Sequence, residues 1–414
     1  MRSKLFIALV LLVGYSNEGF SQWDPVKNCL SFGGNCVPNT IIQALPFLRI
    51  APDARGGAMG DAGIAISPDA NSMHYNAANL AFATEESSLS ATYTPWLREL
   101  NLNDVFLAYL TGYKKLDENQ AVGVGLRFFS LGSINFVDVD QNSLGVGKPR
   151  EWEIAVAYSR KLGDKLSASL TGKYIYSNLA TGQIVNGIEI NSATSFGADI
   201  GLAYRDNKFK IGGYRAELAF GLSITNIGAK VGYNPDQLDR AFIPTNLGIG
   251  SYLRIDLDDY NSLAFALDIN KLLIPTPIFP TIFDENGGEI TNPEFDKNNN
   301  GVADFRERSV FDAMISSFGD AQGGLSEELQ EFSFSIGAEY WYDKQFAIRA
   351  GYYYEHPLKG ARKYLTFGVG LKYNAFGMNI SYLAPTSIVR NPLDNTLRFG
   401  MTVNMAEFAA QNAQ

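Results

Sequence analysis

The stretch Leu166-Ser-Ala-Ser-Leu-Thr-Gly-Lys-Tyr-Ile-Tyr176 decides the fold. Side chains of a strand point alternately to its two faces, so this stretch predicts a strand with one apolar and one polar face. A transmembrane barrel wall has this pattern, because lipid lies outside it and water inside. The apolar or small positions are Leu166, Ala168, Leu170, Gly172, Tyr174 and Tyr176, and the polar ones are Ser167, Ser169, Thr171 and Lys173.

The same alternation recurs from residue 87 to the end of the chain. It predicts an all-β fold, a 14-stranded antiparallel transmembrane β-barrel, and an even strand number places both ends of the barrel on one side. The predicted strands lie near residues 87–95, 103–113, 119–131, 150–162, 164–178, 194–206, 214–227, 245–256, 260–271, 331–342, 345–356, 361–373, 376–384 and 395–405.

The connections between these strands alternate in length. Every second one is a short turn, whereas the others include residues 132–149, 179–193, 228–244 and the longest, 272–330. Outer-membrane barrels have short periplasmic turns and longer extracellular loops. The alternation therefore predicts which end of the barrel faces the outside.

The first residues predict export. Arg2 and Lys4 precede the apolar run from Leu5 to Val13, and small residues lead to a cleavage site near Ser21. This is a secretory signal peptide over residues 1–21. With an outer-membrane barrel behind it, the predicted location is the bacterial outer membrane, with the lipid bilayer as a partner. A net charge of −9 excludes nucleic acid, whose phosphates need clustered Lys and Arg.

The predicted barrel domain spans residues 87–405. Three segments of the mature chain lie outside its strands. Residues 22–86 lack strand alternation and are expected to form a plug or hatch, inside the lumen or across its periplasmic mouth. Residues 272–330 form a long extracellular loop that begins proline-rich, which argues against a central strand. Residues 406–414 form a C-terminal tail.

The long loop contains a twelve-residue segment that matches the EF-hand calcium loop. Oxygen ligands fall at positions one, three, five, seven, nine and twelve, and Gly301 stands at position six, where the loop bends sharply. The alternative is a solvated, asparagine-rich loop tip. We expect a structural Ca²⁺ here, bound at about 0.1–1 mM as in extracellular modules. The predicted ligands are Asp296, Asn298, Asn300, the carbonyl of Val302, Asp304 and Glu307.

The two cysteines, Cys29 and Cys36, lie close together after the signal peptide. In an exported protein they predict a small disulfide loop, the alternatives being free thiols or a metal pair. No acid, base and nucleophile set is recognisable, and the two histidines, His74 and His356, have no metal-ligand spacing. We therefore expect a protein that is not an enzyme.

Two strings in the predicted plug carry a family resemblance. They are Phe47-Leu-Arg-Ile-Ala-Pro-Asp-Ala-Arg-Gly-Gly-Ala-Met-Gly-Asp-Ala-Gly63 and Asp69-Ala-Asn-Ser-Met-His-Tyr-Asn-Ala-Ala-Asn-Leu-Ala-Phe82. Both closely resemble the PorV family, outer-membrane proteins of the bacterial type IX secretion system. The architecture resembles the FadL transporter group, whose hatch carries an Asn-Pro-Ala motif. Asn76-Ala77-Ala78 occupies the matching place here, without the proline.

The resemblance implies a shuttle for exported proteins. A PorV-like protein binds the C-terminal signal domain of cargo emerging from a SprA-type translocon and delivers it to a PorU-type sortase. The alternative is a FadL-like channel for hydrophobic small molecules. The predicted lumen-facing residues are mainly polar, which favours the shuttle.

Overall fold

The computed structural model describes residues 23–24, 29–32, 35–36, 38–98, 102–137, 142–185, 188–234, 240–283, 289–386 and 394–412. The predicted signal peptide, residues 1–21, lies outside them. No helix in this part of the chain is long and apolar enough to cross a membrane.

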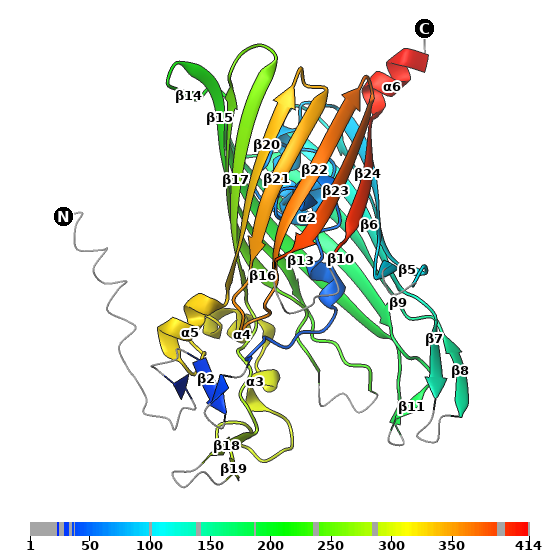
Figure 1. The fold of residues 1–414 in the computed structure, drawn as a ribbon, viewed down its shortest axis with the longest axis vertical. Coiled ribbons are helices and arrows are strands. Elements are labelled where there is room, and N and C mark those ends of the chain that lie inside the picture. The colour runs from blue at the N-terminus through cyan, green and yellow to red at the C-terminus, as the bar shows by residue number, and fades with distance from the viewer. Residues whose placement is uncertain are drawn as a thin grey trace, which may run out of the picture.

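Among the described residues, fourteen antiparallel strands close into a barrel (Figure 1). Each wall strand pairs with the wall strand that follows it in the sequence, and the last, β24, pairs with the first, β4, to close the barrel. The predicted fold is confirmed, and the boundaries lie within about two residues of those expected from alternation. The wall strands are β4 (Ser87–Pro95), β5 (Val105–Lys115), β6 (Gln120–Leu131), β9 (Arg150–Lys161), β10 (Leu166–Asn178), β13 (Ala193–Asp206), β15 (Tyr214–Gly228), β16 (Asn246–Asp256), β17 (Asn261–Leu272), β20 (Phe332–Tyr342), β21 (Phe346–Tyr354), β22 (Lys363–Tyr373), β23 (Phe376–Pro385) and β24 (Leu397–Asn404).

Strand β10 shows why alternation identifies the wall. Ser167, Thr171 and Lys173 point into the barrel and are buried, whereas Leu170 points outward and is 60% exposed. A whole strand face of exposed apolar side chains, repeated from strand to strand, is typical of a wall that contacts lipid. Each wall strand therefore has its apolar face toward the bilayer.

The two ends of the barrel differ as predicted. Short connections, with the small strand β14 (Lys210–Ile211) and helix α6 (Met405–Asn412), lie at one end (Figure 1). We assign the opposite end, with its long connections, to the extracellular side. That end carries β7 (Ile134–Val137), β8 (Ser143–Gly147), β11 (Ile184–Val185), β12 (Ile188–Glu189), β18 (Thr281–Phe283), β19 (Glu289–Thr291), α3 (Asp304–Glu307), α4 (Val310–Ser316) and α5 (Gly324–Gln330).

The N-terminal segment enters the barrel from the extracellular end. The backbone N–H groups of Asn39 and Ala44 donate to the carbonyls of Leu358 and Phe242, at 2.9 and 2.8 Å, in extracellular connections. The small sheet of β1 (Trp23–Asp24), β2 (Cys29–Phe32) and β3 (Asn35–Cys36) belongs to the same end (Figure 1). A position across the periplasmic mouth is therefore wrong for these residues. Apolar residues, Ile41 and Leu45 among them, hold the segment at the outer rim.

Residues 46–83 then fill the lumen. They form η1 (Pro46–Arg49), α1 (Ala54–Gly57), α2 (Ser72–Tyr75) and η2 (Ala77–Phe82), and almost all of them are buried. Glycines of the wall let this plug approach closely. A Cβ on Gly351 would lie 2.1 Å from the backbone nitrogen of Gly60, which itself has a φ of +71°. The plug thus packs against the strands through backbone as well as side chains.

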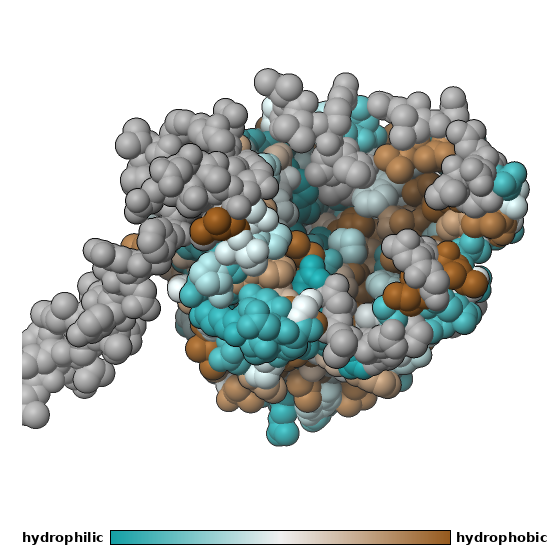
Figure 2. Space-filling model, turned by 90° about the horizontal axis from the view of Figure 1, so that it is seen from below, coloured by the Kyte–Doolittle hydropathy of each residue, from teal (hydrophilic) through white to brown (hydrophobic). Residues whose placement is uncertain are grey.

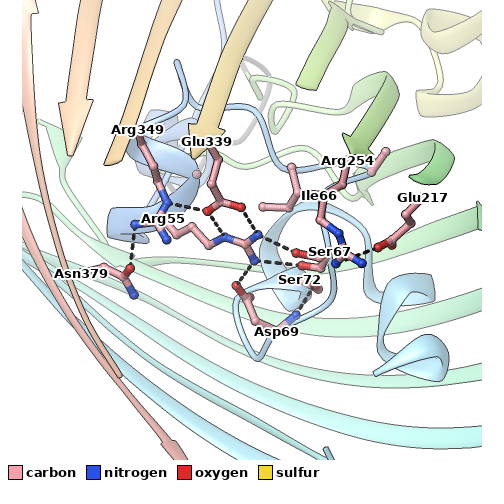
Figure 3. A network of polar contacts seen from close by, with 12 residues as sticks. Arg55, Ile66, Ser67, Asp69, Ser72, Glu217, Arg254, Glu339, Arg349 and Asn379 are labelled. Atoms are coloured by element: carbon pink, nitrogen blue, oxygen red, sulfur yellow. Dashed lines mark hydrogen bonds and ion pairs between the residues drawn. The ribbon is translucent and has the colours of Figure 1, made fainter. Parts of the chain in front are cut away.

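A buried ion cluster joins the plug to the wall (Figure 3). Arg55 of α1 donates through Nε and Nη2 to both carboxylate oxygens of Glu339 in β20, at 3.0 and 2.8 Å. Arg349 of β21 donates through Nε to the same carboxylate at 2.6 Å. Arg55 also pairs with Asp69, at 3.0 Å, so that two parts of the plug meet at one guanidinium. We call Arg55, Glu339 and Arg349 the plug lock.

Replacing Glu339→Ala should loosen the plug. Removal of one partner from a buried ion pair leaves uncompensated charge and costs about 3–5 kcal/mol, and here it leaves Arg349 without its carboxylate and Arg55 with Asp69 alone. We expect a lower thermal unfolding midpoint of the detergent-solubilised barrel and new ion leakage in planar bilayers. Glu118→Ala, in an exposed turn, should change neither quantity. An unchanged midpoint in Glu339→Ala would contradict the role of the lock.

Candidate functional site on the extracellular face

An apolar cleft of about 520 Å³ opens on the extracellular face. It lies between the N-terminal segment and the two connections that follow β4 and β21. Figure 2 views the molecule from this end and shows a hollow lined by both hydrophobic and hydrophilic residues. The apolar lining residues of the cleft are Ile41, Pro46, Phe47, Ile50, Trp96, Leu97, Leu102, Val105, Phe129 and Leu131.

The floor of the apolar cleft is part of the packed core. Trp96 meets Phe129 edge to face, with ring centroids 5.0 Å apart and an interplanar angle of 84°. Phe47 and Leu48 of the plug are buried in the same cluster, together with Leu107 of the wall. The cleft therefore ends on the plug, and its open side faces outward.

Two polar atoms of the cleft have no partner within the described protein. The indole Nε1 of Trp96 and the side-chain Oε1 of Gln43 are both buried and form no hydrogen bond. Nearly all buried polar groups in proteins are paired, so an orphan requires an explanation. One donor and one acceptor within an apolar lining are what ligand sites use to fix orientation.

Charged side chains form one edge of the cleft. Arg49 and Arg362 both donate to the carboxylate of Glu355, at 3.2 and 2.8 Å, and Arg362 also donates to the hydroxyl of Tyr353 at 2.9 Å. Burial alone would raise the pKa of Glu355, but the two guanidinium groups hold it down at about 2. Glu355 is therefore ionised at any physiological pH, and the group of Arg49, Arg362 and Glu355 carries one excess positive charge.

A second buried ion cluster binds the end of the long loop, residues 272–330, to the extracellular rim of the barrel. Lys271 pairs with Glu328 and Glu331, at 3.0 and 2.5 Å, and Lys359 pairs with Glu327 and Glu331, at 2.6 and 3.0 Å. All five side chains are at least nine-tenths buried. Helix α5 is thus fixed both to the end of β17 and to the connection beside the apolar cleft.

Earlier in the loop, Arg308 contacts Asp320 at 2.9 Å. Burial raises the pKa of Asp320 to about 6, against the opposing hydrogen bonds from Thr276 and the charge of Arg308. This pair closes the segment that contains α4.

The structure brings the two ends of the predicted calcium loop together. Side-chain amides of Asn298 and Asn300 donate to the two oxygens of Glu307, at 2.7 and 2.5 Å. The N–H of Gly301, whose φ is +83°, donates to Asp296 at 2.8 Å, and Asp304 accepts from the N–H of Lys297 at 3.2 Å. Among the described residues no group of three or more His, Cys, Asp and Glu is placed to hold a metal. An ion here would need amide and backbone oxygens as well.

The two cysteines and the two histidines are the remaining residues that the sequence analysis considered. The side chain of Cys29 lies outside the described residues, so the Cys29–Cys36 disulfide stays a prediction. His74 lies in the plug with Nδ1 2.6 Å from Nη2 of Arg127, and His356 lies in the extracellular connection after β21.

The sequence did not indicate the apolar cleft. Its main aromatic residues, Phe47, Trp96 and Phe129, are spread over more than 80 positions. In the sequence, each of these aromatic residues is explained by its own position, at a strand end or in the plug, without a shared site. Only the path of residues 38–50 over the outer rim brings them together, and no local pattern specifies that path.

Several solved structures similar to this chain are described as transporters or channels. The toluene transporter TbuX of Ralstonia pickettii is 11% identical, with 84% of this chain and 96% of that chain covered and a TM-score of 0.44. The toluene transporter TodX of Pseudomonas putida is 12% identical, with 88% and 98% covered and a TM-score of 0.45. A FadL homologue of Pseudomonas aeruginosa is 10% identical, with 88% and 99% covered and a TM-score of 0.40. Likenesses this distant carry no conclusion about function.

Among the curated proteins, none matches this chain. The family model described as "Type IX secretion system protein PorV" matches residues 35–279, which include both strings of the plug and nine of the wall strands. That match spans more than half of the chain, and it agrees with the outer-membrane barrel described above. The chain therefore belongs to the PorV family of type IX secretion system proteins.

Proposed function

We propose that this type IX secretion component is a shuttle that binds exported proteins on its extracellular face. It takes the C-terminal signal domain of cargo leaving a SprA-type translocon and delivers it to a PorU-type sortase. The observation that carries the proposal is the apolar cleft, which opens outward, ends on the plug and holds an unpaired hydrogen-bond donor and acceptor. An apolar side chain of the cargo could fill the cleft, and the peptide group next to it could hydrogen-bond to Trp96 and Gln43.

The filled lumen supports this proposal over diffusion through the barrel. Besides the cleft, the described residues enclose a cavity of about 560 Å³ at the periplasmic end and one of about 100 Å³ between plug and wall. Charged residues, including Arg55, Asp69 and Glu339, line the larger one. An apolar molecule that entered the cleft would meet the plug and then a charged vestibule.

Leu102→Arg should weaken cargo binding. Leu102 is partly exposed at the edge of the cleft, so the substitution leaves the barrel intact but introduces a charge that any apolar occupant must desolvate. We expect about tenfold less exported protein to co-purify with the barrel, equivalent to 1.4 kcal/mol. The matched control is Leu116→Arg, in an exposed turn at the opposite end. Equal recovery with both variants would refute the cleft as the binding site.

A second candidate function is the uptake of hydrophobic small molecules, which the volume and lining of the cleft favour. If the protein is a shuttle, proteoliposomes that contain the barrel should take up a labelled fatty acid no faster than empty liposomes, because the plug lock keeps the plug in the lumen. Faster uptake that is abolished by Leu102→Arg would establish the channel instead. Glu339→Ala serves as the positive control, since its plug is loosened.

We further propose that the loop Asp296–Glu307 binds a structural Ca²⁺. The support is the complete ligand pattern and the contact of Glu307 with Asn298 and Asn300. A turn of each amide about its last bond exchanges its nitrogen for its oxygen, which would give the ion an oxygen from each asparagine. The backbone carbonyls of Arg306 and Arg308 accept from Lys230, so an ordered loop would be connected to the rim.

Calorimetry on the whole barrel tests the calcium site. We expect binding at about 0.1–1 mM, abolished in Asp296→Ala/Glu307→Ala because the first ligand and the bidentate ligand are lost together. Glu294→Ala removes a nearby exposed carboxylate outside the ligand set and should leave binding unchanged. Absence of heat at millimolar Ca²⁺, or the same heat from the double variant, would reject the site.

A further inference from the structure

Helices α4 and α5 expose an apolar stripe. Its members are Phe311, Ile315, Phe318, Leu325 and Leu329, which are 70, 78, 51, 65 and 60% exposed. All five values exceed that of the lipid-facing wall residue Phe265 (47%), and four of them exceed that of Ile336 (53%). Five large apolar side chains exposed together are unusual on a surface that meets only water.

The polarity of the two helices is the reverse of that of a helix in water. Glu327 and Glu328 of α5 point inward to Lys359 and Lys271, while its leucines point outward. On α4, Ala313 packs into a buried cluster at the rim and Phe311 and Ile315 face away from it. Between residues 310 and 330, all of which the structure describes, Asp312 is the one exposed charged residue. A soluble amphipathic helix would present the opposite face.

The stripe continues the lipid-facing surface of the wall. In β17 the odd-numbered residues from Leu263 to Ile269 point outward, and Lys271 follows in the same register. The ammonium of Lys271 lies 5.8 Å from the ring centroid of Phe318 and 5.5 Å from that of Phe332. Phe332 is in register with the outward residues of β20, such as Ile336. In Figure 1, α5 projects sideways beyond the end of β17.

The stripe also lies at the level of an aromatic girdle. Outward-facing rings meet in runs at the extracellular ends of the strands, and such girdles mark the membrane interface. Phe332 extends this girdle along β20, and Lys271 connects it to Phe318, which follows α4. The contacting pairs are Tyr93–Phe106, Phe106–Phe128, Trp152–Tyr174, Tyr174–Phe196 and Phe334–Tyr354, with centroids 5.2 to 6.4 Å apart.

We propose that α4 and α5 lie in the interface of the outer leaflet, with the apolar stripe buried among lipid acyl chains. Interfacial helices of this kind place one apolar face about 5–10 Å into the headgroup region. The ion cluster of Lys271, Glu328 and Glu331 fixes their height against the wall. The long loop is then supported by the membrane on one side of the barrel, and the apolar cleft remains free for a partner.

Lipid-borne quenchers test the proposal on the full-length barrel in phosphatidylcholine liposomes. Ile315→Cys and Leu325→Cys are labelled with an environment-sensitive fluorophore under non-reducing conditions, with wild-type protein as the control for native cysteines. Ile336→Cys, on the wall, gives the response of a lipid-facing site. Lys297→Cys, at an exposed loop position, gives that of a site in water.

We expect brominated phosphatidylcholine to quench positions 315 and 325 as it quenches 336, and aqueous iodide to quench only 297. Quenching of 315 and 325 by iodide, with no response to brominated lipid, would overturn the proposal. The stripe would then belong to a protein partner. Neither result depends on cargo binding at the apolar cleft.

Discussion

The plug lock is the interaction on which the rest of the architecture depends. A fourteen-stranded barrel without it would enclose a polar, water-filled lumen. In this structure the plug fills the lumen, and its buried Arg55 forms an ion pair with Glu339 of the wall. Arg349, on the neighbouring strand, binds the same carboxylate. Separating such buried partners would leave uncompensated charge, so this contact favours one position of the plug. Beyond the plug, the N-terminal segment is held by its own contacts with the extracellular connections.

With the lumen filled by the plug, the apolar cleft opens on the extracellular face. Residues 38–50 leave the plug toward the extracellular rim and there complete an apolar cleft with Trp96 and Phe129. A distinct set of charges, with Lys271 and Lys359 at its centre, holds the long loop at the same rim. In the type IX secretion component the apolar cleft and the long loop therefore lie together on the extracellular face.

Some of this could be predicted from the sequence. Strand alternation is a local pattern with a period of two, and it located the wall strands to within about two residues. The spacing of oxygen-bearing side chains in residues 296–307 is equally local, and the Ca²⁺ that it indicates stays a prediction. The plug lock was not predictable, because Arg55 and Glu339 are 284 positions apart and nothing nearby marks either as a partner. The path of residues 38–45 was misjudged for the same reason: contacts with Phe242 and Leu358 determine it.

That path also has a consequence for assembly. Ser87 begins the wall at the periplasmic end, yet residues 38–45 are bound at the extracellular end, so the chain crosses the whole lumen before its first wall strand. Once β4 has paired with β24, the buried plug leaves no passage for a folded three-stranded sheet. An N-terminal segment that crosses while the seam between β24 and β4 is still open avoids this obstacle.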